Sequence, residues 1–291
     1  PPRKSSPFSK SSANFDGIAL ATSIYSLARF KTTRGQNEVG DQDPRLNELL
    51  DFTSKSIALE PGAWGDRALA NTCWSVAKLG LQAPALFDAI ARVATPKVDS
   101  FTPQSLTNTA WAFSTAEIPA PELFDAIALA AASKVGAFTP QALANTAWAY
   151  ATAGVPAPAL FEAIALAAAS KVDAFIPQAL ANTAWAFSTA GVPAPALFDA
   201  IALAAASKVG AFTPQALANT AWAYSTAGVA APALFEAIAR AAVPKIDAFT
   251  PQALANTAWA YSTAGVAAPA LFEAIARAAA SKVDEFTPQN L

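Results

Sequence analysis

Amide and indole side chains recur along this sequence at one fixed interval. Asparagine and glutamine offer paired hydrogen-bond donors and acceptors, and tryptophan offers a flat ring face with one N–H donor. These groups can bind and orient a partner, but they supply neither a nucleophile nor an acid–base pair. The candidate site consists of Gln104, Asn108, Trp111, Gln141, Asn145, Trp148, Gln178, Asn182, Trp185, Gln215, Asn219, Trp222, Gln252, Asn256 and Trp259.

Composition excludes several classes of chemistry. The 291 residues contain no histidine and one cysteine, Cys73, so a Ser-His or Cys-His pair, a histidine-containing zinc site and an internal disulfide are all ruled out. We expect Cys73 to be a buried small hydrophobe. The acidic residues recur at fixed repeat positions without a convergent pair, so we expect no enzyme, no cofactor and no metal.

Hydrophobic residues make up 54% of the chain, and alanine supplies much of that fraction. The longest apolar runs, such as residues 126–132, are far shorter than the roughly 18 residues that a membrane-spanning helix needs. We therefore expect a soluble chain that is rich in a strong helix former and has no membrane span.

The elements that position the candidate site follow from an exact period of 37 residues, which tryptophan keeps from Trp74 to Trp259 and phenylalanine from Phe101 to Phe286. Periods of about 20 to 50 residues indicate a solenoid, in which stacked units share one continuous core. The sequence predicts an all-α, right-handed α-solenoid of about seven 37-residue helix-turn-helix repeats.

The unit that spans residues 101–137 shows how each repeat is built. Its first helix, helix A, is predicted from the N-cap and N1 pair Thr102-Pro103 to about Ala116. Its second, helix B, is predicted from Pro121 to near Lys134. Most other units carry glycine at the start of the intervening turn, which suits a helix C-cap.

The same frame divides the whole chain. Residues 1–13 form a basic, Ser/Pro-rich tail, and residues 14–60 a divergent N-terminal capping hairpin with a polar insertion at 31–43. Tyr25 aligns with the tryptophan position, Trp64 with the phenylalanine position, and Leu20 and Leu27 with other helix A positions. Six repeats occupy residues 61–285, and residues 286–291 start a truncated further repeat. We expect the natural chain to continue there, or a protein partner to cover this open end.

Helical periodicity assigns a core face to each helix. In helix A, Leu106, Ala110 and Phe113 share the core side, whereas Gln104 and Asn108 lie nearly opposite, with Trp111 beside them. In helix B the predicted core side consists of Leu123, Phe124, Ile127 and Ala131.

One leucine of helix B points away from that core, and its equivalents in other repeats are arginine. Either these leucines contact the neighbouring repeat, or they form an exposed protein-docking strip. The strip would consist of Leu129, Leu166 and Leu203.

A lysine ends helix B in every repeat, and it has two interpretations. It complements the negative end of its helix, or it forms a phosphate site with the free N–H groups of the next helix start. The lysines are Lys97, Lys134, Lys171, Lys208, Lys245 and Lys282.

The unit FTPQALANTAWAYSTAG, at residues 249–265, resembles the octotricopeptide repeat and the similar heptatricopeptide repeat. The resemblance covers roughly residues 61–291, and residues 14–60 weakly. It implies a non-enzymatic protein of the chloroplast or mitochondrion that binds single-stranded RNA, about one nucleotide per repeat, with helix A lining the groove. It implies a role in transcript stability, processing or translation. Many members also carry a nuclease-like RAP domain, which this sequence lacks, so we infer no cleavage activity.

The residues fit such a groove, since amides can read base edges and an aromatic ring can stack on an unpaired base. Their alternative roles are structural: asparagine ladders can satisfy backbone groups, and tryptophans can wedge repeats together. A uniform amide row would recognise a near-homopolymeric run, or it would carry little sequence information.

Charge favours a second hypothesis. Residues 101–285 carry 7 basic and 11 acidic side chains, a net charge of −4, which disfavours a phosphate backbone. The chain would then be a structural or assembly scaffold that binds protein partners in an organellar complex, such as a ribosome or photosystem.

Overall fold

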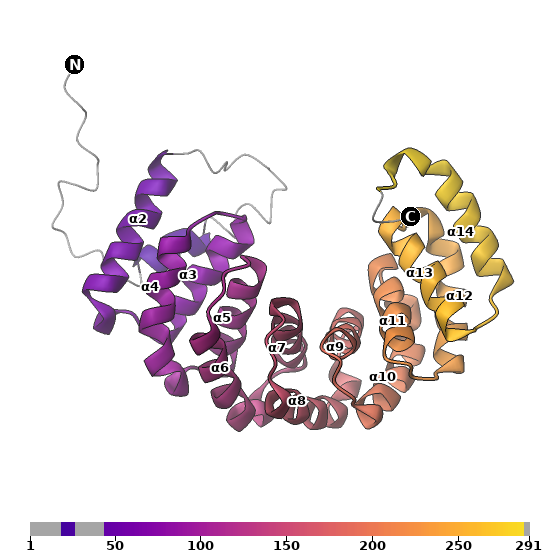
Figure 1. Ribbon diagram of the computed structural model, residues 1–291, viewed down its shortest axis with the longest axis horizontal. Helices are drawn as coiled ribbons and strands as arrows, with labels where there is room; N and C mark the ends of the chain where they lie inside the picture. The colour runs from indigo at the N-terminus through magenta and orange to yellow at the C-terminus, as the bar shows by residue number, and fades with distance from the viewer. Residues whose placement is uncertain (1–18, 27–43, 288–291) are drawn as a thin grey trace, which may run out of the picture. The chain divides into compact units, whose positions relative to one another are not determined.

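The computed structural model of the chain describes residues 19–26 and 44–287, and every regular element in these ranges is a helix (Figure 1). Neighbouring helices pack in succession, which confirms the all-α solenoid of helical repeats. The predicted tail at 1–13, the insertion at 31–43 and Leu27 lie outside the described residues, as do residues 288–291 of the predicted further repeat. The chain divides into two units, Pro1–Lys134 and Val135–Leu291, which we describe separately.

The first unit contains a helical segment at 19–26 followed by the helices α2 to α6, in which α3 packs against α5 and α2 against α4. Its elements are α2 (Pro44–Leu59), η1 (Pro61–Ala63), α3 (Asp66–Leu79), α4 (Pro84–Ala94), η2 (Thr95–Ser100), α5 (Pro103–Thr115) and α6 (Pro121–Lys134).

The second unit contains four helical hairpins in two rows: the A helices α7, α9, α11 and α13, and the B helices α8, α10, α12 and α14 (Figure 1). Neighbouring A helices contact each other more extensively than neighbouring B helices do. The elements are η3 (Val135–Ala137), α7 (Pro140–Ala153), α8 (Pro158–Ser170), η4 (Val172–Ala174), α9 (Pro177–Thr189), α10 (Pro195–Lys208), η5 (Val209–Ala211), α11 (Pro214–Thr226), α12 (Pro232–Ala242), η6 (Val243–Ala248), α13 (Pro251–Ala264), α14 (Pro269–Ser281) and η7 (Val283–Glu285).

Local chemistry sets the helix bounds as the sequence predicts. The Thr102 hydroxyl accepts a hydrogen bond from the backbone N–H of Ser105 at 3.1 Å, and Pro103 is the first residue of α5. Helix α7 ends at Gly154, which adopts a left-handed φ of 64°, and the Val155 N–H donates back to the Tyr150 carbonyl at 3.1 Å. The equivalent turn after α5 contains Glu117, whose φ of 55° is the only positive value of a non-glycine residue in the described ranges.

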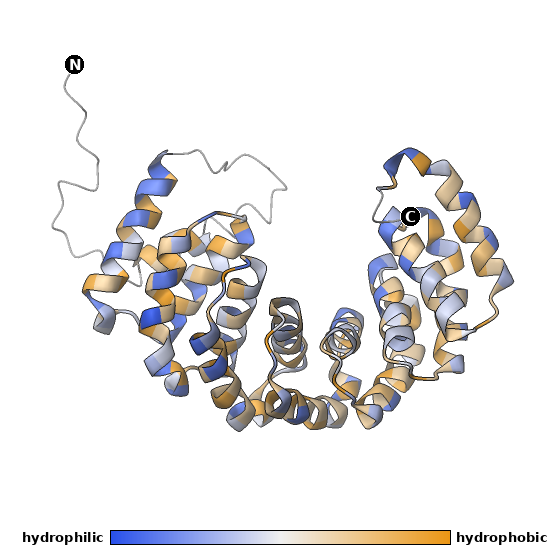
Figure 2. Ribbon diagram, viewed as in Figure 1, coloured by the Kyte–Doolittle hydropathy of each residue, from blue (hydrophilic) through white to orange (hydrophobic). Residues whose placement is uncertain are grey.

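The buried residues match the predicted core faces. Leu106, Ala110 and Phe113 of α5 are at most 1% exposed, and all four predicted core residues of α6 are buried. Figure 2 shows apolar residues in the helices of every repeat. Cys73 is fully buried, as expected, and burial raises the pKa of its thiol to about 12.

Within each unit, edge-to-face aromatic pairs join neighbouring repeats. An aromatic residue of helix A packs against a phenylalanine of the preceding helix B, with ring centroids 5.0 Å apart for Phe161 and Phe187 and 5.1 Å for Phe198 and Tyr224. These contacts occupy the core side of helix A, so its opposite side is left for the polar row.

The helical segment at 19–26 contacts the next repeat through Tyr25. The Tyr25 ring lies 5.6 Å from that of Trp74, at the position where later repeats pair tryptophans. Trp64 is fully buried.

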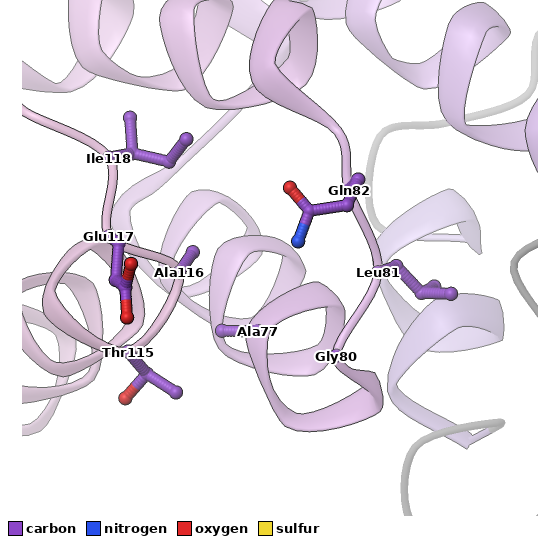
Figure 3. Close-up of a pocket in the computed structure, with 8 residues that line it drawn as sticks. All are labelled: Ala77, Gly80, Leu81, Gln82, Thr115, Ala116, Glu117 and Ile118. Atoms are coloured by element: carbon purple, nitrogen blue, oxygen red, sulfur yellow. The ribbon is translucent and has the colours of Figure 1, made fainter.

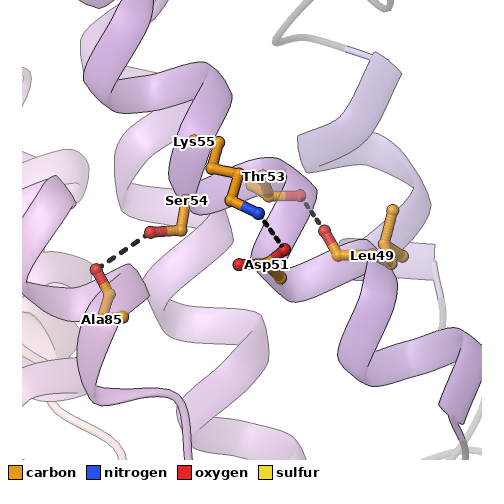
Figure 4. Close-up of polar contacts among 6 residues, drawn as sticks. All are labelled: Leu49, Asp51, Thr53, Ser54, Lys55 and Ala85. Atoms are coloured by element: carbon orange, nitrogen blue, oxygen red, sulfur yellow. Dashed lines mark hydrogen bonds and ion pairs between the residues drawn. The ribbon is translucent and has the colours of Figure 1, made fainter. Parts of the chain in front are cut away.

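Polar contacts on α2 are shown in Figure 4. Ser54 donates to the Ala85 carbonyl of α4 at 3.1 Å, and Lys55 pairs with Asp51 at 2.6 Å along one exposed face of α2. The first of these contacts ties α2 to α4.

Candidate nucleic-acid interface

The predicted amide row lies on the A helices, on the side away from the core. Every glutamine of the row is exposed and every asparagine is half-buried. The asparagines are Asn108, Asn145, Asn182, Asn219 and Asn256. Within the described ranges, none of their side-chain amides forms a hydrogen bond with another part of the protein. These amides therefore do not satisfy backbone groups between the repeats, which was the structural alternative for them.

Hydroxyl groups make the buried side-chain hydrogen bonds of the A helices, the threonines within their own helix and a serine between repeats. Thr183 and Thr220, each one residue after a row asparagine, are fully buried and bond to the carbonyl four residues earlier. Ser225 donates to the Ala260 carbonyl of the next A helix at 2.6 Å. The serine, and not a row asparagine, makes this contact between repeats.

The tryptophans pair between neighbouring A helices beside the amides, and in the described ranges no ring contact joins Trp185 to Trp222. Ring centroids are 6.2 Å apart for Trp74 and Trp111, 6.5 Å for Trp148 and Trp185, and 6.4 Å for Trp222 and Trp259, with tilts of 32° to 38°. Trp259 is 47% exposed, and the other tryptophans of the row are half-buried. The indoles thus contact each other between repeats and also present ring surface to solvent.

Charge is distributed unequally between the two rows of helices. Helices α5, α7, α9, α11 and α13 contain no charged side chain at all. The acidic residues of residues 101–285 lie on the B helices and in the connecting segments. The net charge of −4 is therefore not located on the amide and indole row.

The recurring lysines bind backbone carbonyls of a segment 33 and 35 residues earlier, or 33 and 36 for Lys97. Lys171 Nζ lies 2.7 Å from the Gly136 carbonyl and 3.0 Å from that of Phe138. The remaining lysines are half-buried and make the same kind of contact. Two of the three ammonium donors are thus engaged with a loop. A phosphate contact through the third donor stays a prediction.

The three leucines of helix B are exposed. Leu129, Leu166 and Leu203 are 75%, 72% and 77% exposed, so most of each side chain faces solvent, and a docking strip stays a prediction. Leu129 belongs to the first unit, and the other two lie on α8 and α10 of the second.

A shallow hollow of about 380 Å³ lies between two successive turns of the first unit (Figure 3). Figure 3 shows Gln82 and Glu117 on opposite sides of it. Sequence reasoning placed Glu117 in a turn and did not single out this hollow. Its lining combines one carboxylate with neutral groups, and we assign it no chemistry. Among the described residues, no group of three or more acidic or cysteine side chains could hold a metal ion.

Membrane insertion has no candidate segment in this part of the chain. None of the helices in the described ranges is long and apolar enough to cross a bilayer.

Stacked helical hairpins, whose A helices α5, α7, α9, α11 and α13 are uncharged, define a helical-repeat protein. The family described as RNA-editing substrate-binding complex 6 protein matches residues 51–202 and again residues 131–291, and the chain belongs to this family. The two matches overlap, as expected when a tandem array fits in more than one register. None of the curated proteins compared with the chain matches it.

Proposed function

We propose that this chain is a non-enzymatic protein that binds single-stranded RNA along its A helices. The observation that carries the proposal is the row of half-buried asparagine amides without a hydrogen-bond partner in the protein, next to partly exposed indoles. Unpaired bases are recognised by this combination, in which an amide reads the base edge and an aromatic ring stacks on the base.

The spacing of the indoles supports about one nucleotide per repeat. Neighbouring bases in a stacked strand are about 3.4 Å apart. The centroid separations of 6.2 to 6.5 Å are nearly twice that value. An extended strand with unstacked bases matches this spacing, and a double helix does not.

The absence of charge along α5, α7, α9, α11 and α13 determines how such a strand binds. Base stacking contributes about 1–3 kcal/mol per base, whereas phosphate contacts add affinity that falls steeply with salt. We therefore expect bases to face the A helices and phosphates to face solvent, with a weak dependence of affinity on salt. Because the row is uniform, the preferred strand is near-homopolymeric.

The cellular role follows from the family and from the sequence resemblance. The matching family is named for an RNA-editing substrate-binding complex. The resemblance to the octotricopeptide repeat implies that the protein acts in the chloroplast or the mitochondrion. It also implies a role in transcript stability, processing or translation. Import of the tagged chain into one of these organelles is the measurement that separates them.

The experiment compares Asn182→Ala/Asn219→Ala with the wild-type chain. Because these amides make no hydrogen bond within the protein, the midpoint of urea unfolding should stay within about 0.5 kcal/mol of wild type. The affinity for labelled homopolymeric RNA, measured by fluorescence anisotropy, should fall by about tenfold, as expected for two lost base contacts.

The control is Leu166→Ala/Leu203→Ala, which changes two exposed side chains on the B helices and should leave both RNA affinity and stability unchanged. An unchanged RNA affinity in the asparagine variant would contradict the proposal. So would a decrease in the free energy of unfolding as large as the decrease in the free energy of RNA binding.

A scaffold function is the second candidate, and the exposed leucines of the B helices favour it. The two functions use different rows of helices, so one chain can perform both.

A further inference from the structure

The outer faces of α8 and α10 combine exposed leucine with exposed acid. Leu166 follows Glu162 by one helical turn, and Leu203 follows Asp199 in the same way. All four side chains are exposed, and α8 packs beside α10. Together they form an apolar and acidic patch on one side of the second unit, which we call the Leu–acid patch.

In the described part of the chain, neither Glu162 nor Asp199 forms an ion pair. The basic side chains nearest to it in the sequence are Lys171 and Lys208, and each ammonium group is hydrogen-bonded to two backbone carbonyls of a loop. A partner that covers the leucines must therefore approach two carboxylates that are free to pair with it.

The next two repeats provide an internal contrast. In α12 and α14 the leucine position carries Arg240 and Arg277, again one turn after an exposed acid. These helices carry a positive charge one turn after each carboxylate and offer no apolar side chain at that position. The leucine-to-arginine change thus marks where the Leu–acid patch ends, and it would repel a basic partner from α12 and α14.

We propose that the Leu–acid patch binds a basic amphipathic helix of a partner protein, whose apolar face covers Leu166 and Leu203 and whose lysine or arginine side chains pair with Glu162 and Asp199. Binding of a helix through a few apolar anchors with charges at the rim is a common mode of peptide recognition. This surface lies on the B helices and is separate from the proposed RNA row on the A helices.

A second copy of the chain fits this surface poorly, because a symmetric contact would bring the same carboxylates against each other. RNA fits poorly for the same electrostatic reason.

The test uses the full chain and a labelled synthetic helix with leucine on one face and lysine on the other. Its counterpart with glutamate in place of lysine serves as the matched probe. Fluorescence anisotropy should show binding of the lysine helix and not of the glutamate helix. Leu166→Arg/Leu203→Arg should weaken binding by about tenfold or more, because it removes both apolar anchors and adds repulsive charge.

The matched control is Thr189→Arg/Thr226→Arg, which adds the same charge at exposed positions on the A helices. Circular dichroism confirms that both variants are folded. Arg240→Leu/Arg277→Leu extends the patch and should tighten binding.

Three results would overturn the proposal: no binding of the lysine helix to the wild-type chain, equal loss in the leucine and threonine variants, or equal binding of both probes. Dimerisation of the wild-type chain that Leu166→Arg/Leu203→Arg abolishes would assign the surface to a second copy instead, and would overturn it as well.

Discussion

Two kinds of junction join the A helices of the second unit, and they differ although the repeats are nearly identical. Between α9 and α11, the Ser188 hydroxyl donates to the Ala223 carbonyl, the Tyr224 hydroxyl donates to the Phe198 carbonyl at 2.6 Å, and Thr213 caps α11. The junction between α11 and α13 has the same three hydrogen bonds.

The junction between α7 and α9 has none of these three bonds. Ala151 replaces the serine, Phe187 replaces the tyrosine, and Ile176 replaces the capping threonine and leaves α9 without a side-chain cap. The aromatic contact itself is kept, with the Phe161 and Phe187 rings 5.0 Å apart and nearly perpendicular. Apolar packing therefore sets the geometry of every junction, and hydrogen bonds tune its strength. We expect the α7–α9 junction to open first.

Removing the three hydrogen bonds from the α9–α11 junction should have the largest effect on the free energy of unfolding. Ser188→Ala/Thr213→Ile/Tyr224→Phe converts the α9–α11 junction to the α7–α9 pattern. A buried hydrogen bond and an N-cap each contribute about 1 kcal/mol, so unfolding should become easier by about 2–3 kcal/mol in urea titrations. A change below about 0.5 kcal/mol would mean that packing alone determines junction strength.

Alkaline pH should weaken the strong junctions selectively. Burial raises the pKa of Tyr224 and Tyr261 well above the ordinary value of 10.0 for a tyrosine phenol. The folded state therefore holds these protons more tightly, so its stability is complete below pH 10 and falls as pH rises above it. The slope is about 1.4 kcal/mol per pH unit for each phenol.

Tyr224→Phe/Tyr261→Phe should lower stability at pH 7 and reduce this alkaline slope. Urea unfolding between pH 8 and pH 11 measures both effects. The buried thiol of Cys73, whose pKa is raised to about 12, also makes the free energy of unfolding fall as pH rises above 9. Cys73→Ala removes this contribution and serves as a control. Equal alkaline slopes in the wild type and the tyrosine variant would contradict the burial of these phenols.

Restoring the missing cap should strengthen the weak junction. Ile176 is 54% exposed at the N-cap of α9, where threonine stands in other repeats. Ile176→Thr should stabilise the chain by about 1 kcal/mol and slow amide hydrogen exchange at the start of α9. Thr213→Ser, which keeps a capping hydroxyl at α11, is the matched control and should change little.

The smallest expected difference concerns the lysines. Lys208 bonds the Asp173 and Phe175 carbonyls in the loop before α9, whereas Lys245 bonds the Gly210 and Phe212 carbonyls before α11. Each is expected to contribute about 1 kcal/mol. Lys208→Met should increase hydrogen exchange in its loop more than Lys245→Met does, because its junction lacks other polar ties.

The lysine variants also test the phosphate assignment. A decrease in the free energy of RNA binding that exceeds the decrease in the free energy of unfolding would support a phosphate contact. An unchanged RNA affinity would reject it.

Local features were the most predictable from sequence. The threonine–proline pair at 102–103 and the glycine at 154 act within a few residues of themselves, so the bounds of α5 and α7 follow from them. The 37-residue period predicts the same helix bounds in every repeat. Helical periodicity predicts that the amide row lies opposite the core.

Contacts between repeats were not predictable in the same way. The carbonyl that Lys171 reaches lies 33 residues away, and its position depends on how successive loops stack. The exchange of Ser188 for Ala151 looks like a neutral change of one small residue, and its effect depends on a carbonyl in the next helix. The exchange of tyrosine for phenylalanine is visible in the sequence, but its meaning also depends on a carbonyl in the preceding repeat.

Photo-crosslinking tests the central claim most directly, because it reports where RNA lies on the protein. A thiouridine-containing homopolymeric strand is bound to the full chain, irradiated, and its attachment sites are mapped by mass spectrometry. The account predicts crosslinks on the A helices at Trp185, Trp222 and Trp259, and their loss in Asn182→Ala/Asn219→Ala. Crosslinks confined to the B helices or to the lysine-bound loops, or none at all, would contradict it.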